Sequence, residues 1–167
     1  MDRDRALLRH FLAAIAYRTQ KALRDAPPHF PNFSAGHRAR TPVELLRHMA
    51  SLMGYARTLF VGGSYPVRPD PLRTFNDEIA RFHENVQTLG QLLEGGVALR
   101  EISTEQLLQG PFADVMTHVG QLALLRRLAD APVAPENFIY ADIHGDRLGP
   151  RQAPPARPDT HWPERPQ

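Results

Sequence analysis

The chain has 167 residues, of which 42% are hydrophobic and 23% charged, and this balance predicts one soluble globular domain with a substantial core. The 20 Lys and Arg residues against 18 Asp and Glu residues leave a formal net charge of only +2, and no basic run with interleaved aromatics occurs, which argues against nucleic-acid binding. The absence of cysteine excludes disulfides, zinc–thiolate sites and a cysteine nucleophile, and no apolar run approaches the roughly 18 residues of a membrane span.

The first predicted helix spans Asp2 to Arg24. Apolar residues recur there at intervals of three and four positions, which is the spacing of one helix face. Prolines come after it and end the helix: Pro27, Pro28 and Pro31. Arg9 and His10 interrupt its apolar part, so the segment lacks the pattern of a secretion signal. With no such signal and no membrane span, a cytoplasmic location is expected.

Two further helices have clear start or stop signals. In the second, Thr41 can cap the helix, Pro42 suits its first position and Glu44 can bond back to the cap. Its broad apolar face ends at the glycine pair 62–63. The third helix is predicted from Leu72 to Leu93, where an apolar stripe ends just before another glycine pair.

The segment from Val97 to Gln109 is ambiguous. Its first residues alternate like a short strand, whereas the residues from Ser103 to Gln106 resemble a helix start, and we predict an extended connector with a turn. A fourth helix is predicted from about Gly110 to Asp130, with prolines just beyond it. The apolar stretch 137–143 is expected to dock on the helices.

Four amphipathic helices without convincing strand pairs predict an all-α fold, a four-helix bundle. We assign the bundle to residues 1–149 as a single domain. Residues 150–167 are proline-rich and charged, which predicts an extended tail. The long loops after the first and second helices leave the order of up and down helices open.

Of the eight histidines, six are expected to be solvated residues without a function. Four of them lie in predicted loops or at the surface: His10, His29, His37 and His161. His83 falls on the polar side of the third helix, and His144 lies near a loop glycine. His48 and His118 differ, because both lie inside apolar helical stretches.

Asp114 and His118 are four residues apart in the fourth predicted helix, so their side chains leave nearly the same face. Apolar neighbours predict that this face is buried, where an unpaired carboxylate would be costly. A divalent metal held by His48, Asp114 and His118 would satisfy all three groups, and three protein ligands leave coordination positions open. Gln121 is either a support for these ligands or a polar residue of the helix surface.

Interpretations without a metal stay open. Each histidine can be a core residue hydrogen-bonded to a neighbour, and Asp114 and His118 can form a hydrogen-bonded pair. Glu44, one turn before His48, could join the site or act as a base. Its place in the predicted capping box favours a structural role instead.

Two segments resemble the DinB-like superfamily, to which the DinB and YfiT types belong. Arg40 to Leu52, RTPVELLRHMASL, is similar to its second-helix segment, and Phe112 to Ala129, FADVMTHVGQLALLRRLA, to its H-x-x-x-H-x-G-Q segment. Pro132 to Ile143 resembles the next segment of some members. Altogether the resemblance covers most of the chain from Leu7 to Ile143.

The resemblance implies a metal held by three side chains, often histidines, from the second and fourth helices. His48 matches the first ligand and His118 the last, while Asp114 stands where the middle histidine usually is. Two histidines and one carboxylate still suit zinc, nickel or ferrous iron. Similar characterised proteins include S-transferases that use low-molecular-weight thiols such as bacillithiol or mycothiol, in which the metal binds the thiol as thiolate.

The sequence supports two hypotheses of function. The first is a metal-dependent enzyme, either an S-transferase in which zinc, nickel or iron activates a low-molecular-weight thiol that attacks a small-molecule substrate, or a hydrolase. The second is a non-catalytic bundle with a degenerate or lost metal site, acting as a homodimer or through a stress-response partner. The substituted ligand and the apolar surplus on the second and fourth helices motivate the second hypothesis. Neither involves nucleic acid or a membrane.

Overall fold

The computed structural model describes residues 2–158, and within them the regular structure is helical, with no strand. Four long helices form a bundle: α1 (Arg3–Leu23), α2 (Pro42–Val61), α3 (Phe75–Glu94) and α5 (Ala113–Leu128). Four short elements accompany them: η1 (Phe30–Asn32), α4 (Thr104–Leu107), η2 (Leu108–Phe112) and η3 (Phe138–Tyr140). The predicted all-α four-helix bundle is therefore confirmed.

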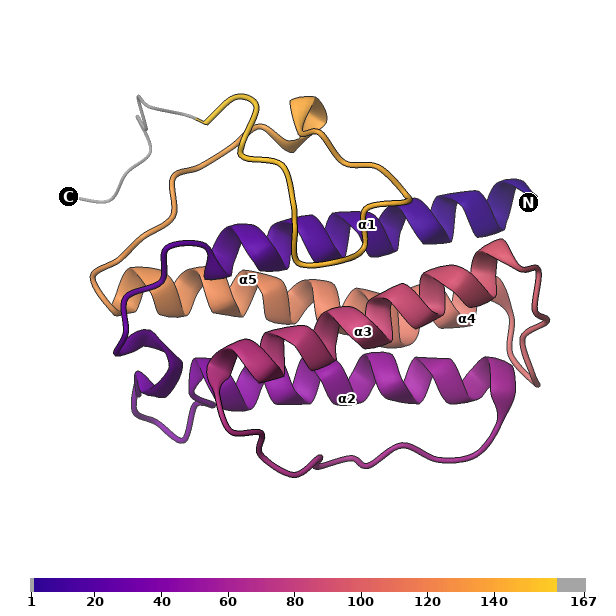
Figure 1. Ribbon diagram of the computed structural model, residues 1–167, viewed down its shortest axis with the longest axis horizontal. Helices are drawn as coiled ribbons and strands as arrows, with labels where there is room; N and C mark the ends of the chain where they lie inside the picture. Colours follow the sequence, from indigo (N-terminus) through magenta and orange to yellow (C-terminus); the bar gives the residue numbers. More distant parts are fainter. Residues whose placement is uncertain (1, 159–167) are drawn as a thin grey trace.

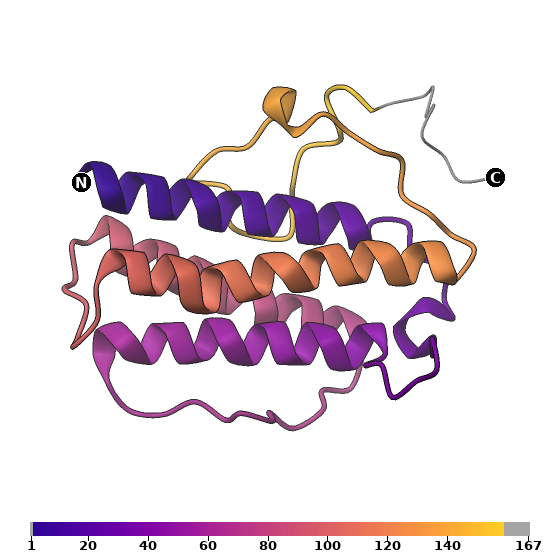
Figure 2. The ribbon, with the colours of Figure 1, turned by 180° about the vertical axis from the view of Figure 1, so that it is seen from behind.

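The direction of the helices, which the sequence left open, has an up-down-down-up order (Figure 1). α1 and α5 run in the same direction, and α2 and α3 run antiparallel to them. The connection 62–74 therefore returns along the outside of the bundle before α3 begins. Each long helix packs against two others, so that α1, α5, α2 and α3 form a ring in which α2 adjoins α5 (Figure 2).

Side-chain caps determine where the helices begin. Thr41 and Glu44 form the predicted capping box: the Thr41 N–H donates to Glu44 Oε2 at 2.8 Å, and the Glu44 N–H donates to Thr41 Oγ1 at 3.5 Å. The third helix begins at Phe75 rather than at the predicted Leu72, because Thr74 caps it in a second box with Asp77.

The ambiguous segment before the last helix contains no strand. It is irregular up to Ser103, whose hydroxyl accepts from the Gln106 N–H at 3.2 Å and starts the single turn α4. A wide helical turn, η2, then leads into α5, and Gly110 inside it departs from helical geometry with φ −86° and ψ −110°. α5 therefore begins at Ala113, three residues later than predicted.

The core lies along the inner faces of the four long helices and includes buried aromatic, leucine and methionine side chains: Tyr17, Phe30, Phe82, Phe112, Leu12, Leu45, Leu46, Leu89, Met49 and Met53. The carboxylate of Glu78 on α3 is also buried. It accepts from Arg47 Nε on α2 at 2.9 Å, from the Leu72 N–H at 3.0 Å and from the Arg81 guanidinium. These partners satisfy the charge and join α2 to α3.

His83 is not on a solvated face as predicted, because only 1% of the residue is exposed. Its Nδ1 lies 2.9 Å from the backbone oxygen of Leu148, which identifies Nδ1–H as a donor. The Leu148 side chain is buried against Gly90, where an added Cβ would lie 2.0 Å from Leu148 Cδ1. The segment after α5 therefore crosses α1 and covers the α3 residues that the helical pattern assigns to solvent (Figure 1).

The predicted docking of residues 137–143 is found in part. The Phe138 ring lies 3.6 Å from the Arg18 guanidinium carbon, whereas Ile139 is 85% exposed. Beyond the predicted boundary at Gly149, the described residues 150–158 form no helix, and Arg24 Nη2 donates to the backbone oxygen of Gln152 at 2.9 Å. Among the described helices, none has both the length and the apolar character that a bilayer span requires.

Candidate metal centre

His48 and His118 come from the two helices that lie side by side on one face of the bundle. The capping box fixes the start of α2, and His48 lies two turns later on its half-buried side. The break at Gly110 directs the chain into α5, which places Asp114 in the first turn of that helix and His118 one turn further. A carboxylate in this first turn is favoured by the positive end of the helix dipole.

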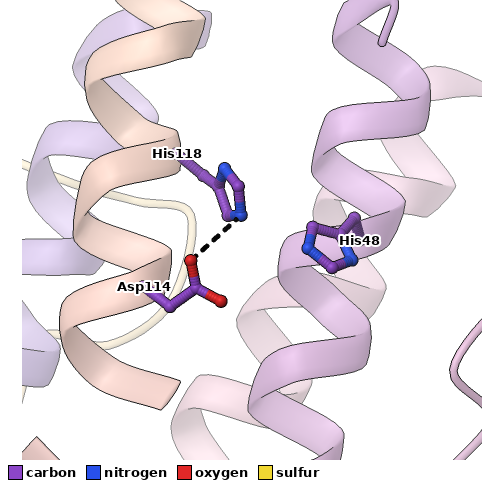
Figure 3. Close-up of side chains that lie close together, drawn as sticks. All are labelled: His48, Asp114 and His118. Carbon is purple, nitrogen blue, oxygen red and sulfur yellow. Dashed lines mark ion pairs between the residues drawn. The ribbon is translucent and has the colours of Figure 1, made fainter. Parts of the chain in front are cut away.

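The three predicted ligands converge. One candidate ligand atom each from His48, Asp114 and His118 lies within 4.8 Å of the other two (Figure 3). No other group of three or more such residues occurs in the described part of the chain. The residues can therefore hold a metal ion.

The spacing of the atoms is close to that of a coordination shell. His118 Nε2 and Asp114 Oδ1 are 3.3 Å apart. The edge of a tetrahedron with metal–ligand bonds of about 2.1 Å is roughly 3.4 Å, so this pair already has the required separation. The His48 and His118 rings meet at 71° with centroids 4.9 Å apart. A side-chain movement of His48 on the order of 1 Å would complete the set.

Gln121 determines which nitrogen of His118 is free to bind a metal. Its Oε1 lies 2.9 Å from His118 Nδ1, so Nδ1 carries a proton and donates it to the amide oxygen. In the neutral imidazole, Nε2 then presents a lone pair toward the Asp114 carboxylate. Two acceptors facing each other at 3.3 Å repel unless a cation or a proton lies between them. The prediction that Gln121 supports a ligand is therefore consistent with a direct hydrogen bond between Gln121 and His118.

The burial of the set differs from the sequence prediction in one respect. His118 is buried, with 8% exposed, but the Asp114 side chain is 49% exposed. The expectation that Asp114 is a buried charge in need of a cation is therefore wrong. The first turn of α5 lies beside the kinked η2 segment and borders an open cleft. The exposure of Asp114 leaves one side of the centre open to small molecules.

The electrostatic environment keeps His48 in its neutral, ligand-competent form. Burial lowers the pKa of His48 below its usual value, and the charges of Arg40 and His118 lower it further, while Asp114 opposes them. A histidine binds a metal through a neutral ring, so a lowered pKa extends the pH range in which it can do so.

Two clefts adjoin the centre. Asp114 lines one of about 440 Å³, whose walls are mostly apolar and include Leu52, Tyr55, Leu59, Ile102 and Pro111. His48 lines the other, of about 610 Å³, with four arginines: Arg38, Arg40, Arg47 and Arg68. Sequence reasoning missed the arginines. Arg38 and Arg40 come just before the cap of the helix that carries His48, and this position in the sequence could have indicated that they lie near the site. Arg68 comes from a loop, and no sequence pattern links that loop to the site.

The remaining candidates are not part of the centre. Both oxygen contacts of the Glu44 carboxylate are with Thr41, so Glu44 has the structural role that was favoured for it. The exposed histidines lie elsewhere, as expected: His10, His29, His37 and His144. His161 lies outside the described residues.

No family model, curated protein or solved structure shows significant similarity to this chain. The resemblance to the DinB-like superfamily therefore stays a prediction from the two sequence segments. The all-α bundle and the convergence of His48, Asp114 and His118 rest on the structure alone.

Proposed function

We propose that this chain is a metal-dependent enzyme of the DinB-like type that transfers a low-molecular-weight thiol to a small electrophile. The observation that carries the proposal is the meeting of His48, Asp114 and His118, of which Asp114 also lines an apolar cleft. Three protein ligands with open positions are typical of a catalytic rather than a structural metal site.

The donor set suits a borderline divalent ion. Two imidazoles and one carboxylate fit zinc, nickel or ferrous iron, and the absence of cysteine leaves no thiolate ligand in the chain. When bound, such an ion lowers the pKa of a thiol, so that the nucleophilic thiolate forms near neutral pH. The chain itself would supply no sulfur, which is consistent with a cosubstrate that does.

The protein groups have separable roles in this proposal. Gln121 holds His118 in the tautomer that leaves Nε2 free, and Asp114 contributes negative charge at the open side. The apolar cleft would bind the electrophile and exclude water from it, with Tyr55 at its wall. The thiolate sulfur then bonds to the electrophilic carbon, the leaving group departs with the bonding electrons, and the thiol proton goes to solvent.

A spectroscopic titration tests the proposal. Protein loaded with Co²⁺ is mixed with 2-mercaptoethanol as the probe, and a sulfur-to-cobalt charge-transfer band is expected. His118→Ala should bind less cobalt and give no band, while the exposed His10→Ala behaves as wild type. A cobalt-loaded wild-type protein that shows no band at saturating thiol would contradict thiol activation.

The alternative is a non-catalytic, homodimerising bundle, and one observation favours it. Leu124 and Leu128, four residues apart on α5, are 53% and 50% exposed, which leaves an apolar strip on the surface. For this alternative, light scattering should show a dimer that Leu124→Glu dissociates. It also predicts that His118→Ala changes stability without changing any bound ion.

A further inference from the structure

The cleft beside His48 is surrounded by arginine. It lies between the loop before α2, the first two turns of α2 and the loop residues 67–69, and its volume is about 610 Å³. Arg38, Arg40, Arg47 and Arg68 line it together with His48. A guanidinium is always charged at physiological pH and binds carboxylate or phosphate oxygens through paired donors. The lining is therefore suited to an anion.

The positive charge of this cleft is only partly balanced by the protein. Arg47 forms an ion pair at 2.9 Å with the buried carboxylate of Glu78, which it shares with Arg81. Within residues 2–158, no carboxylate forms an ion pair with Arg38, Arg40 or Arg68. Hydrogen bonds from Thr41 and the charges of Arg47 and Arg40 lower the pKa of the Glu44 carboxyl group, which also faces the cleft. Glu44 therefore offsets part of the positive charge, while its Oε2 accepts from the Thr41 N–H and hydroxyl.

The backbone keeps one of these arginines in place at a conformational cost. His37 and Arg38 both have positive φ, 51° and 61°, directly after Gly36. A turn closed by the Ala39 N–H and the Gly36 oxygen at 2.9 Å holds them there. Left-handed conformations are unfavourable for such residues, and they persist where surrounding contacts fix them.

The position of the cleft relative to the three candidate ligands restricts which kind of molecule can carry the bound anionic group. His48 borders the arginine cleft, and Asp114 borders the apolar cleft. The candidate metal therefore lies between an anion-binding region and an apolar one. A substrate that spans both would place its reacting atom at the ligands.

We propose that Arg38, Arg40 and Arg68 bind a carboxylate or phosphate group of the substrate, and that this substrate combines an anionic end with an apolar body. The proposal rests on the proposed function for the identity of the reaction. The anion-binding cleft itself does not depend on a metal, so the two can be tested separately.

The test uses the metal-free full-length protein and two probes, inorganic phosphate and acetate. Binding is measured by calorimetry and by the imidazole proton resonances of the histidines. Phosphate, acetate or both should bind and shift the His48 resonances, while those of His10, on α1, stay unchanged. The double variant R40Q/R68Q should weaken binding by about tenfold or more, because charge-assisted hydrogen bonds are lost. Arg3→Gln, a matched change at the far end of the bundle, should leave it unchanged.

The outcomes distinguish a failure of the anion site from a failure of the metal-dependent function. Equal anion affinity for wild type and R40Q/R68Q, or anion binding without a shift of the His48 resonances, would overturn the anion site even if the protein binds a metal. Arginine-dependent binding in a protein that takes up no metal would support the anion site and contradict the metal-dependent function. A preference for phosphate over acetate, or the reverse, identifies which anion the substrate carries.

Discussion

At the scale of single residues, the two ring nitrogens of His118 have different partners. Nδ1 contacts the Gln121 amide oxygen at 2.9 Å, and Nε2 faces Asp114 at 3.3 Å. A ligand histidine in proteins usually donates its second N–H to an oxygen acceptor in this manner. The contact with Gln121 thus prepares Nε2 for a metal before any metal binds.

Replacing Gln121 should weaken the centre without unfolding the bundle. In Gln121→Ala, His118 loses the acceptor that fixes its tautomer, and we expect zinc affinity to fall by about 10- to 100-fold. Gln121→Glu keeps an acceptor and should retain or increase affinity. Competition with a chromophoric chelator measures both constants. Equal affinities for wild type and Gln121→Ala would mean that the Gln121 contact does not contribute to metal binding.

Variants of Asp114 test whether a carboxylate serves as the third ligand. Asp114→Ala removes one of three ligands and should lower zinc affinity at least tenfold, whereas Asp114→His supplies an imidazole and should restore it. Because Asp114 is half exposed and interacts with the dipole of α5, neither variant should change the free energy of unfolding by more than about 1 kcal/mol. Chelator competition measures the zinc affinity, and urea denaturation measures the free energy of unfolding.

The sequence was sufficient to find three residues that converge in the structure, but not their exposure. The i, i+4 spacing of Asp114 and His118 and the apolar surroundings of His48 depend on helix geometry alone, which is local. The burial of Asp114 depends on how far neighbouring segments extend over the first turn of α5. That coverage depends on η2 and its break at Gly110, which no periodic pattern shows.

At the scale of helices and connections, the segment after α5 is tied back to the end of α1 by Arg126. Only 5% of Arg126 is exposed, and its guanidinium donates to the backbone oxygens of Ala22 at 3.1 Å, Arg24 at 2.9 Å and Ala131 at 2.8 Å. Two of these oxygens lie at the carboxyl end of α1, where the helix dipole favours a cation.

Arg126→Met should therefore destabilise the fold through unsatisfied carbonyl groups rather than through lost packing. Methionine fills a similar volume but donates no hydrogen bond, and we expect a loss of about 2–4 kcal/mol in the free energy of unfolding. Urea denaturation monitored by circular dichroism measures it. The exposed Arg3→Met is the control and should stay within about 0.5 kcal/mol of wild type. A similar small change in Arg126→Met would show that water satisfies those carbonyls.

The start of α2 was predicted from its cap, Thr41 with Glu44, whereas the equivalent cap at Thr74 was overlooked and α3 was predicted to start three residues too early. The docking of Leu148 was not predictable, because it depends on a notch at Gly90 that receives the leucine side chain. Glycine in a helix and leucine in a loop are each unremarkable in sequence. Their fit is a tertiary property. For the same reason His83, which Leu148 covers, was assigned wrongly to solvent.

At the scale of the whole molecule, the buried His83 should make stability depend on pH. Burial lowers the pKa of His83 from 6.5 to about 4. The unfolded chain therefore binds a proton between these values while the folded protein does not. The stabilisation is fully present above pH 6.5 and is lost as the pH falls toward 4, by about 3 kcal/mol in total.

Comparing His83→Asn with wild type isolates this effect from that of the carboxylates. The asparagine amide can donate to the Leu148 oxygen but does not titrate in this range. Its free energy of unfolding, measured by urea denaturation from pH 7.5 to 4.5, should fall less steeply than that of wild type. If the free energies of unfolding of wild type and His83→Asn fell in parallel with pH, His83 would become protonated in the folded protein while the segment that covers it stays folded.

The global arrangement depends on the long connection 62–74, which permits α2 and α3 to run in the same direction. Loop length alone is compatible with other orders, so the sequence could not choose among them. This order brings α5 beside α2 and so places His118 near His48. The candidate centre is thus a consequence of topology as well as of spacing.

Zinc titration of protein purified without a nickel column tests the central claim most directly. Equilibrium dialysis with metal analysis should find one tightly bound zinc per wild-type chain, and little or none in His48→Ala and His118→Ala variants that keep the helical circular-dichroism spectrum. The claim would be contradicted if wild-type protein took up no stoichiometric zinc, nickel or iron, or if both variants bound the metal as tightly as wild type.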